Sequence, residues 1–333
     1  MNYADTQKMK RLTETVERNC RVTRLYANYL ERFPEVITAE MVNTLTEDGF
    51  ITKEEAIVAI LSEMFGLDMQ SSPEDRRIIM DYLTPSVRIL DPLRYTENPY
   101  YKNVKIGNVR DGAWELRLEH YEPYRAVIAG DMLMNEYVEV PPLGFFEERF
   151  DFPAVLENGN EWMTLTPVDL DTCDEAIEAA SGRVVTFGLG LGYYAYMVAR
   201  KPEVESITVI EKSPDVIRLF EKHILPYFEN PEKLRIICAD AFEYAEREMP
   251  KEGYSFAFVD TWRDASDGAP MYEKMRALEH LSKGTRFEYW IENFLVSRLR
   301  YLRFSDICDA IDRGDADAPR SFAEVEALLD FKR

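Results

Sequence analysis

The sequence predicts an α/β protein in which a doubly wound, mostly parallel sheet follows an N-terminal helical region and β-hairpins. From residue 169 onward, short apolar runs alternate with helical patterns, which is typical of a parallel sheet covered by helices. The first hundred residues place apolar side chains three and four positions apart behind polar caps, and two tight-turn signals follow them. The expected regions are a helical N-terminal domain at 1–100, a β-hairpin region and connector at 101–165, and a sheet domain with C-terminal helices at 166–333.

The N-terminal region contains two clear helix starts. Thr52 and Glu55 have the spacing of a capping box, in which each side chain satisfies a free backbone N–H at the start of a helix. Ser72 followed by Pro73 begins another helix, since proline at the first helical position loses no needed hydrogen bond. We therefore expect a small helical domain here.

Two β-hairpins are expected between the helices and the sheet. Strand-like alternation surrounds Asp111-Gly112 and also Asn158-Gly159, and both dipeptides favour tight turns. The segment at 139–150 carries two prolines and several aromatic residues, so we expect a connector or a lid there. The N-terminal helices and the hairpins are expected to fold over the sheet edge and form an acceptor pocket. The aromatic segments at 98–104 and 141–150 are the candidates for its wall.

Five strands are expected after residue 169. Their apolar runs fit strands that are buried on both faces of a parallel sheet. Beyond the last strand the chain is expected to be helical, with Ser321 and Glu324 capping a final short helix. The expected strands are 183–187, 206–210, 234–238, 255–259 and 286–291.

A glycine-rich turn is the strongest functional signal in the sequence. The strand at 183–187 leads directly into Gly188, Gly190 and Gly192, and an apolar helix follows. Glycines let the backbone turn sharply and lie against a ligand, while free N–H groups at the helix start face the ligand's polar atoms. The motif therefore predicts a nucleotide-shaped pocket, although a tight strand-to-helix turn alone would also need these glycines.

Three acidic residues stand at the ends of the next three strands. Glu211 lies 23 positions after Gly188 (211 − 188), the distance at which a carboxylate can accept both ribose hydroxyls. Asp240 ends the third strand and could accept a hydrogen bond from an adenine amino group, and Asp260 ends the fourth. Each acid alone could be a helix cap. Because ligands of open α/β sheets bind beyond the carboxyl ends of strands, all four features predict one site.

The region from about 169 to 291 resembles a class I S-adenosylmethionine-dependent methyltransferase domain, which is Rossmann-like, and is most similar to the spermidine synthase-like branch. NAD binding is less favoured, because position 193 is Tyr where such folds favour a third spaced glycine. The segments that carry the resemblance, in order and spacing, are VVTFGLGLG, VESITVIEKSPDVI, KLRIICADAFEY and FAFVDTWRDASDGAPMYEKM.

The resemblance implies S-adenosylmethionine as cofactor and a role for each matching residue. Asp260 would be the catalytic base beside the sulfonium, or a contact without proton transfer. Trp262 and Tyr194 would face the substrate. Core packing is an equal alternative for Trp262, and it is the commoner role of aromatic residues on a helix such as Tyr194. The implied cofactor-binding residues are Gly188, Leu189, Gly190 and Gly192 for the methionine part, Glu211 and Lys212 at the ribose, and Asp240 and Ala241 at the adenine.

The sequence departs from the family at three places. Thr186 stands where methyltransferases of this class usually carry an acid for the cofactor's amino group, and Leu191 stands where aminopropyltransferases carry an aspartate. The segment at 162–164 replaces a tyrosine-glutamine pair. We therefore expect a methyltransferase of a small, cationic or amine-bearing molecule. Aminopropyl transfer from decarboxylated S-adenosylmethionine and a non-catalytic nucleotide-binding or interaction module remain alternatives.

The amino-acid composition limits the classes of partner that the protein is expected to bind. The 40 Lys and Arg against 61 Asp and Glu give a net charge of −21, which disfavours nucleic acid. Such acidity is usually a solubility device, and it would also suit a cationic small substrate. Four separated cysteines and three isolated histidines predict no metal site and no disulfide framework. We expect a cytoplasmic protein without a membrane segment, since no long apolar run occurs. The sequence does not determine the oligomeric state, and a homodimer is compatible with it.

Overall fold

The structure is a computed structural model that describes residues 3–331. The chain forms two compact units, and each is made from segments that are distant in the sequence. Unit 1 holds the described residues of Met1–Leu90, Glu122–Glu148 and Asn293–Arg333, and unit 2 holds Asp91–Tyr121 and Arg149–Glu292. This division differs from the three consecutive regions that the sequence predicts. Domain units form from elements that bury surface together, and composition along the chain does not reveal which distant segments do so.

Unit 2 is built on a five-stranded parallel sheet. The strand order is β12-β11-β10-β13-β14, so the chain starts in the middle, moves to one edge and returns to the other. This is the doubly wound, Rossmann-like order, and it confirms the predicted fold class. The strands are β10 (Gly182–Phe187), β11 (Val204–Glu211), β12 (Leu234–Cys238), β13 (Phe256–Val259) and β14 (Arg286–Tyr289), within two residues of every expected boundary.

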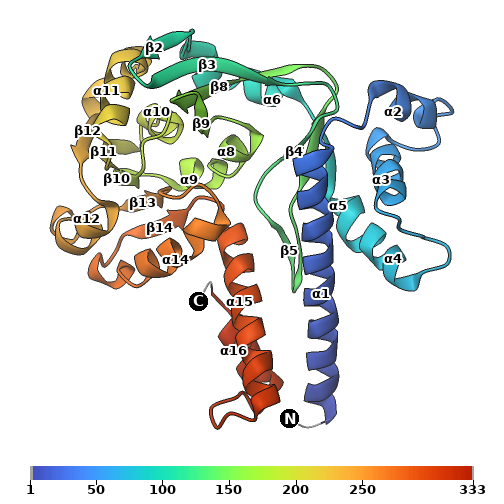
Figure 1. Cartoon of the computed structure of the whole chain (residues 1–333). Coiled ribbons are helices and arrows are strands. Elements are labelled where there is room, and N and C mark those ends of the chain that lie inside the picture. The colour runs from blue at the N-terminus through green and yellow to red at the C-terminus, as the bar shows by residue number, and fades with distance from the viewer. Residues whose placement is uncertain (1–2, 332–333) are drawn as a thin grey trace. The chain divides into compact units, whose positions relative to one another are not determined.

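Helices cover both faces of this sheet. Figure 1 shows α10 (Tyr193–Ala199) and α11 (Pro214–His223) above the strands, with α12 (Ala241–Arg247) and α14 (Ala265–Arg276) below them. Right-handed crossovers explain the split, because the chain reverses direction across the sheet after β12. The remaining helices of unit 2 are α6 (Pro92–Thr96), α7 (Pro99–Asn103), α8 (Pro167–Asp171), α9 (Asp174–Ala179), α13 (Met249–Glu252) and the 3-10 turns η2 (Leu225–Tyr227), η3 (Pro231–Lys233) and η4 (Glu279–Leu281).

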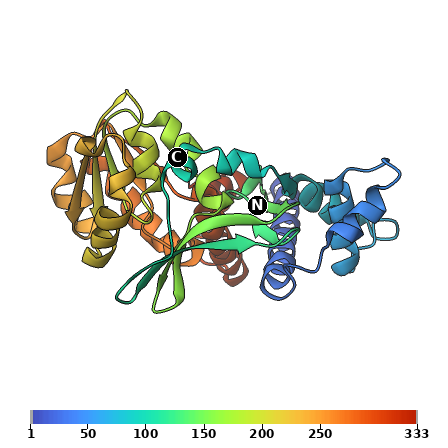
Figure 2. The same ribbon diagram turned by 90° about the horizontal axis from the view of Figure 1, so that it is seen from above.

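A four-stranded antiparallel sheet completes unit 2 and confirms both predicted hairpins. Asn158 and Gly159 have positive φ angles of 52° and 80°, as a two-residue hairpin turn requires. The Asn158 amide donates to the Ala113 carbonyl at 2.7 Å, which ties the two turns together, and Figure 2 shows the hairpin tips next to each other. The strands, in the order β2-β3-β8-β9, are Val109–Asp111, Trp114–Tyr121, Phe150–Glu157 and Asn160–Thr164.

Unit 1 contains the predicted helical region. The Thr52 and Glu55 capping box is present at the start of α3, and the Ser72 side chain accepts from the Asp75 amide at the start of α4. Both expected helix starts are therefore confirmed. The elements are α1 (Tyr3–Arg32), α2 (Ala39–Thr46), α3 (Lys53–Met64), α4 (Pro73–Ile78), the π-helical turn η1 (Ile79–Leu83) and α5 (Thr84–Ser86).

Most of the expected connector at 139–150 instead belongs to unit 1, where residues 143–146 form a core strand, so the connector prediction was wrong for that strand. β7 (Leu143–Phe146) is buried at every position and is the central strand of a small sheet, between β1 (Val87–Leu90) and β4 (Ala126–Ile128). A Cβ at Gly144 would overlap the Leu90 side chain, which explains the glycine. The prolines that suggested a connector only precede the strand. A separate two-stranded ribbon pairs β5 (Leu133–Asn135) with β6 (Val138–Val140).

Two C-terminal helices belong to unit 1. α15 (Glu292–Arg313) and α16 (Phe322–Leu329) pack with α1 around a cluster of apolar side chains. The Ser321 hydroxyl accepts from the Glu324 amide, so the predicted cap of the last helix is confirmed. No helix within residues 3–331 is both long and apolar enough to cross a membrane. The buried members of the cluster are Leu12, Phe304, Ile307, Phe322, Val325 and Leu329.

Candidate functional site

A cavity of about 670 Å³ lies at the carboxyl ends of the parallel strands of unit 2. Its volume is in the range that proteins use for cofactors and small ligands. The glycine turn and the three strand-end acids all line it, so the sequence correctly predicted that they meet at one edge of the sheet. The lining residues named from the sequence are Gly188, Leu189, Gly190, Glu211, Lys212, Asp240, Ala241, Asp260 and Trp262.

The glycine turn is packed too tightly for side chains. Gly188, Gly190 and Gly192 have positive φ angles of 99°, 51° and 72°. A Cβ at Gly188 would overlap the backbone oxygen of Asp260, and a Cβ at Gly192 would overlap the Phe220 ring. Gly192 lines neither cavity of unit 2, so within the described structure it serves the turn and its packing rather than the cavity wall.

Glu211 joins the glycine turn to the second strand. It is the last residue of β11, and only 8% of its surface is exposed. One carboxylate oxygen accepts from the Leu189 amide at 3.2 Å, and the other accepts from the Ser213 amide at 2.8 Å. Each oxygen keeps a second lone pair, so this fixed carboxylate can still accept from a ligand hydroxyl in the cavity.

Asp240 is both a helix cap and a lining residue. One of its oxygens, Oδ1, accepts from the Phe242 and Glu243 amides at 2.9 and 3.0 Å at the start of α12. The helix-cap interpretation is therefore correct for this acid. It does not exclude the ligand interpretation, because Asp240 and Ala241 also line the cavity.

Asp260 has the most perturbed carboxyl group of the cavity. It directly follows β13, and it is partly buried. Burial, reinforced by the nearby carboxylates of Asp169 and Glu211, raises the pKa of Asp260 to about 8. Both causes disfavour the charged form. A group with such a pKa can hold or accept a proton near neutral pH, which is the property that acid–base catalysis needs.

The two aromatic residues named from the sequence lie in different places. Trp262 lines the large cavity, is 6% exposed, and its Nε1 donor has no hydrogen-bond partner within residues 3–331. A buried donor without a partner is costly, and this one is closed off from solvent. Tyr194 does not line that cavity. Its ring stacks on Phe258 with centroids 4.3 Å apart and forms part of the wall of a smaller chamber.

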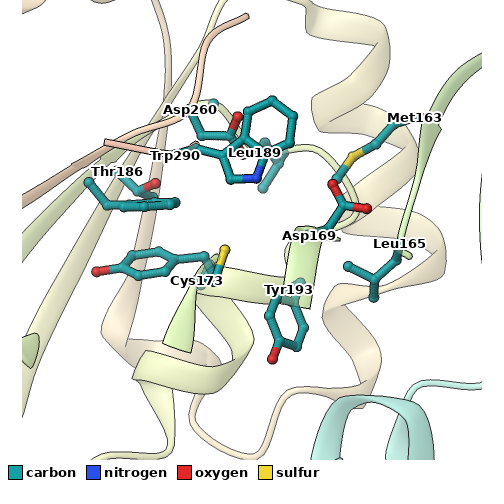
Figure 3. Close-up of a pocket in the computed structure, with 13 residues that line it drawn as sticks. Met163, Leu165, Asp169, Cys173, Thr186, Leu189, Tyr193, Asp260 and Trp290 are labelled. Atoms are coloured by element: carbon teal, nitrogen blue, oxygen red, sulfur yellow. The ribbon is translucent and has the colours of Figure 1, made fainter. Parts of the chain in front are cut away.

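This inner chamber, of about 30 Å³, adjoins the glycine turn. Figure 3 shows Asp169 and Met163 on one side of it, with Asp260, Thr186 and Cys173 around the remainder. The residues that line both the chamber and the large cavity are Met163, Asp169, Gly188, Leu189, Asp260 and Trp290.

Three of these shared residues, Trp290, Asp169 and Met163, were not among the site residues that the sequence predicts. Trp290 directly follows the fifth strand, so the strand-end rule that found the acids could also have found it. Asp169 stands third after Thr166 in a capping box, which marks a helix start but gives no sign of a cavity. Met163 lies in the segment at 162–164 that replaces the expected tyrosine-glutamine pair, but the methionine itself gives no sign that it lines a cavity. Its sulfur accepts from the Leu191 amide at 3.2 Å, a contact that only the fold reveals.

The two aromatic segments expected to form an acceptor pocket line neither cavity among the described residues. In the segment at 98–104, the Tyr100 hydroxyl donates to the Leu191 carbonyl at 2.6 Å, and the Asn98 amide donates to the Tyr193 hydroxyl at 3.0 Å. This segment therefore holds the glycine turn and the start of the following helix through hydrogen bonds. Residues 139–148 lie in unit 1, and Arg149 and Phe150 belong to unit 2. Because aromatic content does not distinguish packing from binding, an acceptor pocket formed by these segments stays a prediction.

Comparison with known proteins gives matches at the level of structure. No protein-family profile and no curated protein sequence matches this chain. A spermidine synthase from Thermotoga maritima is 14% identical, with a TM-score of 0.33, over 46% of this chain and 59% of that chain. Spermidine synthase in complex with the transition state analogue AdoDATO is 15% identical, with a TM-score of 0.34, over 46% and 60%.

A third similar structure is precorrin 8W decarboxylase from Methanobacterium thermoautotrophicum. It is 18% identical, with a TM-score of 0.30, over 45% of this chain and 74% of that chain. The matching part spans about three fifths of the two spermidine synthase chains. The Rossmann-like assignment of unit 2 rests on its own strand order.

Proposed function

We propose that the large cavity of unit 2 binds S-adenosylmethionine and that the protein transfers its methyl group to a small, amine-bearing acceptor. One observation carries this proposal. A glycine turn and the carboxylates that end three successive strands line a single cavity large enough for a nucleoside cofactor.

The lining residues suit the parts of this cofactor in order. Asp240 and the backbone of Ala241 would contact the adenine, and Glu211 would accept from the ribose hydroxyls, with Lys212 beside it. The backbone N–H groups of the glycine turn would face the amino-acid tail. Because β10, β11 and β12 are adjacent in the sheet, these contacts follow one direction along its edge.

The protein's chemical contribution would be alignment and proton transfer. When bound, the cofactor supplies an electrophilic methyl group on a sulfonium. The walls of the cavity would hold the acceptor in line with that group and exclude water. Asp260, with its pKa of about 8, is suited to take the proton that an acceptor amine must lose. Trp262 would form the apolar wall beside it.

Isothermal titration calorimetry tests the binding part of the proposal. We expect S-adenosylmethionine and S-adenosylhomocysteine to bind, and Glu211→Ala to weaken both by at least about tenfold, because it removes the acceptor of the ribose hydroxyls. Glu205→Ala is the matched control, since Glu205 is an exposed acid on the same strand. Equal affinity in the wild type and Glu211→Ala would remove the site assignment.

Aminopropyl transfer from decarboxylated S-adenosylmethionine is the second candidate. It is favoured by the inner chamber, whose described lining includes Asp169 and Asp260 but no Lys, Arg or His that could pair with a ligand carboxylate. A thermal-shift comparison of the two cofactor forms would separate the candidates, because a ligand stabilises the protein in proportion to its binding free energy. Stronger stabilisation by the decarboxylated form would favour aminopropyl transfer. The absence of a shift with either form would favour a non-catalytic module.

A further inference from the structure

The inner chamber has the size of a single small polar group. Its volume of about 30 Å³ leaves room for one water-sized group. Because six of its lining residues also line the large cavity, the chamber extends that cavity beyond the glycine turn. Asp240 and Ala241 line only the large cavity. A nucleoside ligand whose adenine lies near Asp240 would therefore direct its opposite end toward the chamber.

The charge of the chamber favours a cation. Asp169 and Asp260 are the only charged side chains among its thirteen described lining residues. Burial raises the pKa of Asp169 to about 6, and burial together with Asp169 and Glu211 raises that of Asp260. Two carboxyl groups that share a poorly solvated space are best stabilised by a positive charge between them. The other lining groups are apolar or neutral and cannot supply that charge.

Asp169 is held in place from outside the sheet. Its Oδ2 atom accepts from the Thr166 amide at 2.7 Å and from the Thr166 hydroxyl at 2.8 Å, in the capping box that begins α8. These two bonds fix the carboxyl group before any ligand arrives. A carboxylate whose orientation is fixed in advance loses little entropy when it binds a cation.

Thr186 lines the same chamber from β10, two residues before Gly188. It offers a hydroxyl where an acid on this strand would offer a negative charge. We propose that the inner chamber is an ammonium subsite in which Asp169, projecting from α8, supplies the carboxylate that Thr186 lacks and holds the α-ammonium group of the cofactor's amino-acid tail. This assignment rests on the proposed function, since it concerns the tail of the same ligand.

Three ligands that differ only in the tail separate this proposal from the proposed function. S-adenosylhomocysteine carries the whole tail, its deaminated analogue lacks only the ammonium group, and 5′-methylthioadenosine lacks the tail beyond a methyl group. Titration calorimetry of the wild type should show the deaminated analogue binding about tenfold more weakly than S-adenosylhomocysteine, because it leaves the carboxylates of the chamber without a cation.

Asp169→Asn is the decisive variant, because asparagine can still accept from Thr166 through its amide oxygen but carries no charge. It should weaken S-adenosylhomocysteine by about tenfold and change 5′-methylthioadenosine and the deaminated analogue by less than about twofold. Asp171→Asn is the matched control. Asp171 lies on the same helix, pairs with Arg94 at 2.9 Å and lines neither cavity, so its loss should leave all three affinities unchanged.

The results of these titrations distinguish a failure of the ammonium subsite from a failure of the proposed function. An unchanged affinity of Asp169→Asn for S-adenosylhomocysteine, or an equal loss for all three ligands, would overturn the ammonium subsite while leaving nucleoside binding intact in the wild type. A wild-type protein that binds none of the three ligands would contradict the proposed function itself.

Discussion

Asp260 in unit 2 and Glu139 in unit 1 are both poorly exposed acids beside strands, but their surroundings are opposite. Glu139 has a cationic partner, and Asp260 has acidic neighbours. Glu139 is 7% exposed, pairs with Arg300 at 3.0 Å and accepts from the Ser297 hydroxyl at 2.6 Å. Asp260 has no ion pair within residues 3–331 and faces the carboxylates of Asp169 and Glu211. One acid is neutralised inside a core, and the other stands at a cavity among like charges.

The difference shows how a structural acid can be told from a functional one in this protein. A buried charge with a cation and a hydroxyl around it holds elements together, here β6 and α15. A carboxyl group kept among other acids costs stability, and folds retain such groups where a ligand or a reaction needs them. Sequence position alone does not separate the two cases, since both residues sit in or directly after a short strand.

The largest expected effect comes from removing the unpaired acid. Asp260→Asn should reduce the transfer rate by about 10² to 10⁴-fold, because it removes the proposed proton acceptor while keeping the shape of the side chain. Steady-state kinetics and titration calorimetry on the same variant measure this. Glu139→Gln, the control in unit 1, should retain the wild-type rate. A comparable loss of rate in both variants would break the distinction between the two acids.

Removing the paired acid should instead affect stability. Glu139→Ala leaves Arg300 without its partner in a mostly buried place, so the free energy of unfolding should fall by about 3 kcal/mol. Urea denaturation followed by circular dichroism measures the change. Glu139→Gln should cost less, because its amide can still pair with the Ser297 hydroxyl. If Glu139→Ala were as stable as the wild type, the ion pair would have no structural role.

The smallest expected effect is a pH dependence of stability. The pKa of Asp260 is raised from its ordinary value near 4 to about 8 in the folded protein, so the folded state binds more protons than the unfolded state between these values. The contribution of this group is therefore favourable at low pH and is lost as the pH rises toward 8. Asp169 contributes in the same direction, because its pKa is also raised.

Asp260→Asn should remove the loss of stability that the Asp260 carboxyl group causes as the pH rises toward 8. Between pH 5 and pH 8 the variant should gain about 1 to 2 kcal/mol of unfolding free energy relative to the wild type, which is less than the full linkage value for this pKa shift because solvent screens the partly buried side chain. Urea denaturation of both proteins at the two pH values gives the comparison. A gain that is the same at both pH values would show that the carboxyl group does not titrate in this range.

The sequence predicts the sheet of unit 2 well because the signals are local. Each parallel strand is an apolar run, and three of the lining acids, Glu211, Asp240 and Asp260, stand at or just beyond the ends of their strands. Strand boundaries therefore also placed these three acids. The hairpin at Asn158-Gly159 is equally local, since the turn needs two positive φ angles.

The rest depends on contacts between distant segments. β7 is a core strand only because β1 and β4 lie beside it, and no pattern within 139–150 reveals those partners. Asp169 and Met163 reach the cavity from α8 and β9, and their neighbours in the sequence indicate only a helix cap and a hairpin strand. The two-unit division likewise depends on which elements bury surface together.

The most direct test is a crystal structure of the protein grown with S-adenosylhomocysteine. The account predicts that the nucleoside occupies the cavity beyond the ends of β10, β11 and β12, with ribose oxygens within 3.2 Å or so of the Glu211 carboxylate and the adenine beside Asp240. Density for the ligand at any other surface, or crystals that exclude it at millimolar concentration, would contradict the claim that these strand ends form a cofactor site.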